Sequence, residues 1–128
     1  MTTTTPAGVA RSYIEAVGSH DLDTVEGLLA ASLEARVGAG RSDKAQWLAA
    51  LNRLLPALVR NDIRDVYANG SHACVVYDFV TDTPAGGIVC VENVHVDDGL
   101  ITDIELVFDR VAFAPVNEAL TARATASA

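Results

Sequence analysis

One carboxylate in this sequence stands where the pattern predicts a buried side chain. Glu92 lies in Ile88–Val96, a segment dominated by Ile, Val and Cys in which apolar residues recur with a period of two. Burying an unpaired carboxylate is costly, so the pKa of Glu92 must rise or its side chain must find a partner. Two interpretations follow. Glu92 is either an acid that donates a hydrogen bond to a ligand oxygen in a pocket, or a structural acid bound to Arg11, Arg36 or a helix end.

The other residues that could do chemistry give weaker patterns. His20 falls in a predicted loop, His72 at a strand start and His95 on an outer strand face. The three histidines therefore predict no metal site. Cys74 and Cys90 are expected on opposite faces of the sheet, which makes a disulfide between them geometrically unfavourable. We interpret Cys90 as a small buried hydrophobe. The sequence predicts no metal, and no cofactor is expected.

The elements that must position Glu92 are helices followed by strands. A helix is expected to begin after Thr5, a shorter one after Asp21, and a third after Ser42 or Asp43. A short strand at 33–37 lies between the second and third helices. Short turns between the later strands require antiparallel hairpins. The sequence therefore predicts an α+β fold with three N-terminal helices on one face of a mostly antiparallel sheet. Its main strands are expected at Ile63–Ala68, His72–Thr81, Ile88–Val96 and Leu100–Phe108.

Strand register decides which side chains share a face with Glu92. A three-residue loop at Asp97–Gly99 places Glu92 opposite Ile104, whereas a two-residue loop places it opposite Glu105. Because two opposed carboxylates are destabilising, the three-residue loop is preferred. The face that contains Glu92 then supplies an expected ligand-binding wall. This wall consists of Trp47, Val75, Tyr77, Phe79, Cys90, Val94, Ile104, Leu106 and Phe108. Trp47 lies on the third helix and can also be interpreted as a core residue.

The opposite face of the sheet is mixed but rich in valine. Val76, Val80, Val89, Val91 and Val107 are expected there beside polar residues. An apolar sheet face of this kind is typical of self-association. We therefore expect a homodimer through the sheet face.

The composition restricts the remaining classes of partner. The chain has 128 residues, half of them hydrophobic, and a formal net charge of −8. Clustered cations that could replace counterions on nucleic acid are not expected, and the same charge disfavours anionic membranes. No apolar run reaches the roughly 20 residues of a membrane span, and no signal-peptide pattern is visible. We expect a cytoplasmic protein with a single domain over 1–128, a core over 7–113 and flexible ends at 1–5 and 117–128.

Three groups of segments between Val9 and Phe113 carry a family resemblance: Ala10–Val17 with His20-Asp21-Leu22, Gly40-Arg41 before the helix with Trp47, and Val94–Ile101 with Ile104–Asp109. Together they resemble the ketosteroid isomerase and SnoaL-like polyketide cyclase superfamily. The resemblance implies a cone-shaped α+β fold, related to nuclear transport factor 2, with a pocket between a curved sheet and the helices. The superfamily includes isomerases, cyclases, epoxide hydrolases and non-catalytic binders, so the fold alone does not decide function.

The resemblance transfers the isomerase site only in part. It implies that Tyr13 and Glu92 form an oxyanion hole, in which an apolar site keeps the carboxylic acid neutral. Tyr13 can also be interpreted as a packing residue whose hydroxyl lies at the rim. The general-base position aligns with Val37, which cannot take a proton, and the epoxide hydrolase carboxylate position aligns with Leu106.

Two functions remain open. One is an isomerase or cyclase that acts on an apolar, ring-containing carbonyl compound by oxyanion stabilisation, with its usual base missing. Glu34 or Asp78 could supply that base only in a different register. The other is a non-catalytic module that binds an apolar small molecule or dimerises.

Overall fold

The computed structural model describes residues 5–127, so the expected flexibility of residues 1–4 and 128 lies outside the described part. Helices and strands follow one another in the predicted order, with a short strand and a C-terminal helix in addition. The helices are α1 (Pro6–Gly18), α2 (Leu22–Leu28), α3 (Lys44–Leu54) and α4 (Arg110–Ser127), with a 3-10 turn at Leu55–Ala57. The strands are β1 (Leu29–Val37), β2 (Gly40–Ser42), β3 (Leu58–Asn69), β4 (His72–Thr81), β5 (Gly87–Asp97) and β6 (Leu100–Phe108).

Local signals at the helix ends account for the three N-terminal helices. The Thr5 side chain accepts a hydrogen bond from the Gly8 amide. Asp43 and Gln46 form a reciprocal capping box at the start of α3, with both hydrogen bonds 2.9 Å long. Pro56 follows the end of α3, as expected of a residue that interrupts the helical hydrogen-bond ladder. The predicted helix starts are confirmed.

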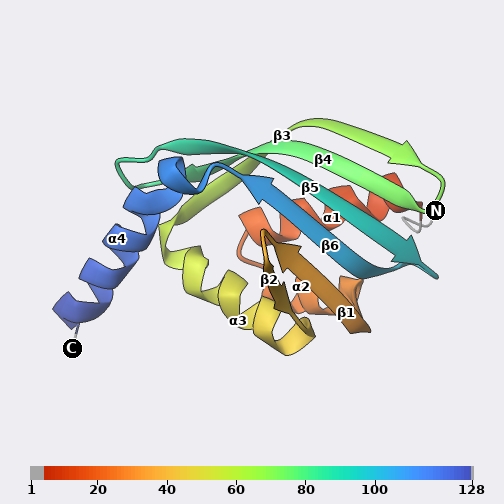
Figure 1. Cartoon of the computed structure of the whole chain (residues 1–128), viewed down its shortest axis with the longest axis horizontal. Coiled ribbons are helices and arrows are strands. Elements are labelled where there is room, and N and C mark those ends of the chain that lie inside the picture. The colour runs from red at the N-terminus through yellow and green to blue at the C-terminus, as the bar shows by residue number, and fades with distance from the viewer. Residues whose placement is uncertain (1–4, 128) are drawn as a thin grey trace.

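The six strands form one sheet in the order β2-β1-β6-β5-β4-β3. Every neighbouring pair is antiparallel except β1 and β6, which are parallel. The sheet arches over α1, α2 and α3, which lie on one of its faces (Figure 1). The predicted α+β architecture is confirmed. Between residues 5 and 127, no helix combines the length and the apolar character that crossing a membrane requires.

The hairpin between β5 and β6 differs from the prediction. Its loop has only two residues, Asp98 and Gly99, both at positive φ (53° and 77°). A bulge at Thr102 then adds one residue to β6, so Glu92 faces Leu106 rather than either predicted partner. The three-residue loop is therefore wrong. The predicted division into faces still holds, because the shorter loop and the bulge each shift the register by one residue and together restore its parity.

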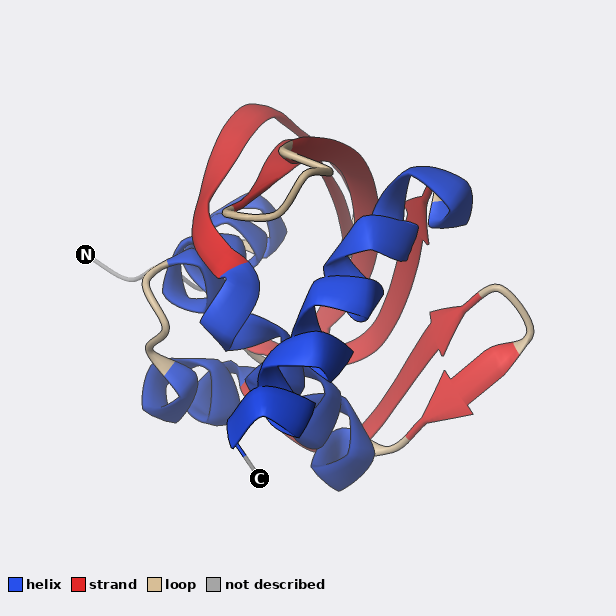
Figure 2. Ribbon diagram, turned by 90° about the vertical axis from the view of Figure 1, so that its left-hand side faces the viewer, coloured by secondary structure: helices blue, strands red, loops and turns tan. Residues whose placement is uncertain are grey.

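From residue 117 onward the sequence is compatible with a frayed helix or a disordered tail, whereas the structure has the longer helix α4 over Arg110–Ser127. It continues through residue 127, and its Val116 and Leu120 side chains are buried, so a core that ends at residue 113 is too short. Phe113 packs on the rings of Phe79 and Phe108, with centroid distances of 5.9 and 5.0 Å. Viewed from the left of Figure 1, α4 crosses in front of the other elements (Figure 2). This helix borders the space between sheet and helices through Phe113 and Asn117.

The docking of α4 through Phe113 can be measured. We expect Phe113→Ala to lower the free energy of unfolding by about 3 kcal/mol, because it removes a buried ring from an aromatic cluster. Val111→Ala, on the same helix at 85% exposure, serves as the control and should leave stability unchanged. Urea denaturation measures both. Equal stability of the two variants would show that α4 is not held by this contact.

Candidate functional site

A cavity of about 230 Å³ lies between the inner face of the sheet and helices α1, α3 and α4. Its wall is almost entirely apolar. Six of the expected wall residues line it, namely Trp47, Tyr77, Phe79, Cys90, Leu106 and Phe108, together with Tyr13 and Glu92. A single cavity thus brings together both residues that carry the proposed chemistry.

Three expected wall residues lie elsewhere. Val75, Val94 and Ile104 point to the same face of the sheet but are at most 1% exposed and form part of the packed core. The physical reason is that α1 packs directly on β4 and β5 and fills the space above that part of the sheet. A strand residue must lie on the inner face of the sheet to line the cavity, but not every residue on that face does so.

Residues from the helices complete the wall, and sequence reasoning did not place them there. Arg53 and Leu54 come from the end of α3, and Phe113 and Asn117 come from α4. Helical spacing did place Leu54 on the apolar face of α3. A signal for Arg53 and Asn117 is lacking, because their position at the cavity depends on how α4 docks.

Glu92 is 2% exposed, and its hydrogen bond from Tyr77 is short. The Tyr77 hydroxyl donates to Glu92 Oε1 at 2.7 Å. Within residues 5–127, the second oxygen, Oε2, is buried without a partner. Neither Arg11 nor Arg36 forms an ion pair with Glu92 in this part of the chain, and Arg36 instead contacts Glu34. These two partners of the structural interpretation are thus not used, and one carboxyl oxygen has no hydrogen-bond partner among the described residues.

Burial raises the pKa of Glu92 from 4.5 to about 7. The hydroxyl groups of Tyr77 and Tyr13 act in the opposite direction, because they stabilise the carboxylate. Since Oε1 accepts the hydrogen bond from Tyr77, a proton on the carboxyl group is held at Oε2. Near neutral pH, Glu92 therefore exists in both forms, and its neutral form is a hydrogen-bond donor.

Tyr13 is fixed by a second buried hydrogen bond. The Trp47 indole Nε1 donates to the Tyr13 hydroxyl at 2.8 Å, and Tyr13 is only 1% exposed. Its hydroxyl is therefore not at the rim. Burial, followed by the nearby Glu92 charge, raises the pKa of Tyr13 well above its usual value, while the Trp47 bond lowers it. Because the indole is only a donor, the phenol must accept from it, and the phenol's own proton can be donated toward the Glu92 carboxylate that it stabilises.

The positions that supply the second functional group in the resembling enzymes are apolar here. Val37 and Leu106 both line the cavity and lie opposite each other on the parallel strands β1 and β6. Among the lining residues that the structure describes, Glu92 is the only carboxylate. The arrangement can therefore donate two hydrogen bonds but offers no separate carboxylate base.

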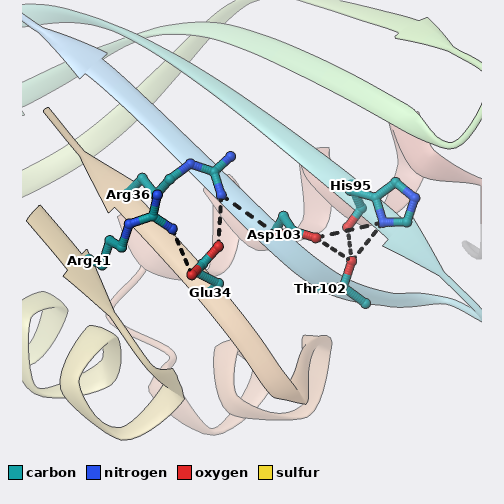
Figure 3. Close-up of polar contacts among 6 residues, drawn as sticks. All are labelled: Glu34, Arg36, Arg41, His95, Thr102 and Asp103. Atoms are coloured by element: carbon teal, nitrogen blue, oxygen red, sulfur yellow. Dashed lines mark hydrogen bonds and ion pairs between the residues drawn. The ribbon is translucent and has the colours of Figure 1, made fainter. Parts of the chain in front are cut away.

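The two alternative bases point away from the cavity. Glu34 lies on the outer face and binds Arg36 at 3.2 Å and Arg41 at 2.9 Å (Figure 3). Both Asp78 carboxyl oxygens accept from the guanidinium group of Arg64 at 2.9 Å, also on the outer face. Since the predicted faces hold, neither carboxylate reaches the cavity.

The histidines lie outside the cavity, and the Cys90 side chain on its wall is a thiol. His20 Nε2 contacts the backbone carbonyl of the first β3 residue at 2.7 Å. On the outer face, His95 Nδ1 contacts Thr102 Oγ1 at 2.6 Å, and its ring lies 4.8 Å from that of His72 (Figure 3 shows His95 and Thr102). Burial raises the pKa of Cys90 to about 12, so it remains a thiol. In the described part of the chain, His, Cys, Asp and Glu side chains form no group of three that could hold a metal ion.

Comparisons with known proteins agree with this fold. A model of the SnoaL-like domain matches residues 10–104. A structure from Kribbella flavida DSM 17836 has a TM-score of 0.80 at 26% identity, with 92% of this chain and 97% of that chain covered.

Two further structures show likeness of fold at lower identity. A candidate ketosteroid isomerase from Kribbella flavida has a TM-score of 0.71 at 19% identity (84% of this chain, 78% of that chain). An LEH-like epoxide hydrolase of M. tuberculosis has a TM-score of 0.72 at 20% identity, with 97% of each chain covered. The comparison with curated proteins gives no match. The expected nuclear transport factor 2-like fold is confirmed.

The buried acid makes stability depend on pH in a defined direction. Because the pKa of Glu92 is higher in the folded protein than in the unfolded chain, its contribution is greatest below the unfolded value and is lost as pH rises toward 7. Between about pH 5 and pH 8, we expect this term to lower the free energy of unfolding by about 2 kcal/mol. Glu92→Gln has no carboxyl group to titrate at this position, so its free energy of unfolding, measured by urea denaturation, should not show this dependence on pH. Glu105→Gln, on the exposed side of the sheet, should behave as the unmodified protein. Parallel pH profiles of the unmodified protein and Glu92→Gln would contradict the assignment.

Proposed function

Because this chain belongs to the SnoaL-like domain family, we propose that its cavity binds an apolar, ring-containing carbonyl compound through Tyr13 and Glu92. The observation that carries the proposal is Oε2 of Glu92, which is buried without a hydrogen-bond partner among the described residues, on an otherwise apolar wall beside the Tyr13 phenol that stabilises the same carboxylate. A buried polar atom without a partner is costly, and a ligand oxygen would satisfy it.

The cavity volume supports a ligand of one or two fused rings. About 230 Å³ exceeds the roughly 150 Å³ that holds benzene in an engineered cavity. It falls below the roughly 300–1,000 Å³ of pockets for drug-sized molecules. Aromatic side chains on three elements, Trp47 on α3, Phe108 on β6 and Phe113 on α4, offer flat apolar surfaces to such rings.

The two donors would polarise the ligand carbonyl. Neutral Glu92 donates from Oε2 and Tyr13 donates from its hydroxyl, while Tyr77 and Trp47 hold these two groups in place. Donors fixed in an apolar site stabilise negative charge on an oxygen, and one such donor changes a reaction rate by roughly 10²–10³. The same hydrogen bonds give affinity and orientation where no reaction follows.

A catalytic role is the second candidate, in the isomerase or cyclase class. It is favoured by the pKa of about 7, since a group that gains and loses a proton near neutral pH suits proton transfer at a carbon next to a carbonyl. The apolar Val37 counts against a mechanism that divides this work between an acid and a separate carboxylate base. We therefore place binding first.

Binding can be measured with 2-naphthol, a two-ring mimic of an enol. If neutral Glu92 is the donor, the dissociation constant of 2-naphthol should rise about tenfold between pH 6 and pH 8, because the protonated fraction of Glu92 falls. Glu92→Gln keeps a donor at this position and should bind without this pH dependence. Glu92→Leu and Tyr13→Phe each lose a donor and should bind roughly five- to tenfold more weakly.

Fluorescence titration measures these constants, and Tyr67→Phe, an exposed tyrosine, is the control for Tyr13→Phe. Affinities that are independent of pH in the unmodified protein, or unchanged in Glu92→Leu, would contradict the proposal.

Catalysis is tested separately with 2-tetralone in deuterated water. Binding alone predicts that the ketone is recovered with no more deuterium next to the carbonyl than in buffer, as read by NMR. Exchange that is accelerated by the protein and lost in Glu92→Gln would instead establish the catalytic candidate.

We also propose that two copies associate through the outer face of the sheet. Val107 and Val89 are 58% and 46% exposed there, and Val107 lies beside Val91 and Val91 beside Val76 on neighbouring strands. Light scattering should give twice the mass of one chain, and Val107→Lys should reduce it to that of a monomer. Val111→Lys on α4 is the control. A monomeric unmodified protein would contradict the proposal.

A further inference from the structure

We infer that the ligand carries a carboxylate, or a comparable anionic group, that Arg53 binds at the mouth of the cavity. This inference rests on the proposed function, because it assigns the second end of the same ligand. Three observations support it: where Arg53 lies, what it is bound to, and how the cavity wall is charged.

The position of Arg53 follows from burial along the wall. Tyr13 and Glu92 line the cavity at 1% and 2% exposure and so mark its closed end. Arg53 and Asn117 also line it but are exposed to solvent, so they mark its opening. A ligand that reaches the buried donors therefore presents its other end to Arg53.

Within residues 5–127, the guanidinium group of Arg53 has no partner of opposite charge. Its Nη1 donates to the neutral Asn117 Oδ1 at 3.1 Å, and none of the ion pairs in this range includes Arg53. Arg53 shares this lack of an ion pair with Arg11 and Arg110, in a chain with 17 acidic and 9 basic residues. A guanidinium group has five N–H donors, so most of them remain available to a carboxylate. Six other cations do pair with acids: Arg36, Arg41, Lys44, Arg60, Arg64 and Arg123.

The charges on the cavity wall favour a ligand whose anionic group lies at the mouth and not at the closed end. Among the described lining residues, Arg53 is the only cation and Glu92 the only carboxylate. When Glu92 holds its proton to bind a ligand oxygen, the site has a net charge of +1 in a chain of net charge −8. Apolar side chains separate the two ends. The site therefore fits a molecule with a neutral oxygen at one end, rings in the middle and an anionic group at the other end.

The simplest alternative is that Arg53 only ties α3 to α4. Asn117→Ala removes this tie and keeps the cation, whereas Arg53→Gln removes the cation. A structural tie would make both variants weaken every ligand to the same extent. An anion site would make only Arg53→Gln discriminate between charged and neutral ligands.

The experiment compares three probes of the same ring system: 2-naphthol, 6-hydroxy-2-naphthoic acid and its methyl ester. We expect the unmodified protein to bind the acid roughly three- to tenfold more tightly than the ester, the range of an exposed but charge-assisted pair. Arg53→Gln should abolish this preference. Arg53→Lys should keep part of it, and Asn117→Ala should keep it in full. Fluorescence titration gives the constants, and circular dichroism confirms that each variant is folded.

Equal affinity for acid and ester in the unmodified protein, or a preference that survives Arg53→Gln, would overturn the inference. If 2-naphthol and the ester still bound in a manner that depends on Glu92, the proposed function would stand without it. If none of the three probes bound, the proposed function would fail, and this inference with it.

Discussion

A carboxyl group buried in an apolar cavity is the constraint on which the rest of this structure depends. The charged form of Glu92 is disfavoured because it has lost its water, and the hydroxyl groups of Tyr77 and Tyr13 compensate for this loss only in part. At a pH above the pKa that this glutamate has in the unfolded chain, such a group destabilises the folded protein. The rest of the structure must therefore supply enough stability to compensate. We interpret this cost as the consequence of keeping a neutral acid ready for a ligand.

The surrounding elements serve to hold that group in place. Alternation along β5 turns Glu92 inward, and the bulge at Thr102 keeps apolar β6 side chains beside it. Helix α1 brings Tyr13 to the same cavity, and α3 brings the Trp47 indole that fixes the phenol. Helix α4 borders the cavity through Phe113 and places Asn117 beside Arg53 at the opening. Buried donors and an exposed cation thus lie at opposite ends of one apolar space.

Sequence patterns predicted the closed end of the site well and the open end poorly. The direction of Glu92 follows from strict alternation, which one strand carries by itself. The register between β5 and β6 depends on both the two-residue loop and the bulge at Thr102. The bulge produces no recognisable pattern in the local sequence. Helix α4 contains Pro115 and many Ala and Thr residues, although its buried positions 113, 116 and 120 have helical spacing that could have revealed it. Arg53 could not be assigned, because its place at the mouth depends on tertiary docking.

The most direct test of the central claim is a carbon-13 NMR titration of the glutamate side-chain carboxyl groups, with Glu92→Gln to identify the Glu92 signal. The account predicts a midpoint near pH 7 for Glu92, where exposed glutamates titrate near 4.3. Saturation with 2-naphthol should move this midpoint upward, because the ligand oxygen binds the protonated form. A midpoint in the ordinary range, or one that is insensitive to the ligand, would contradict it.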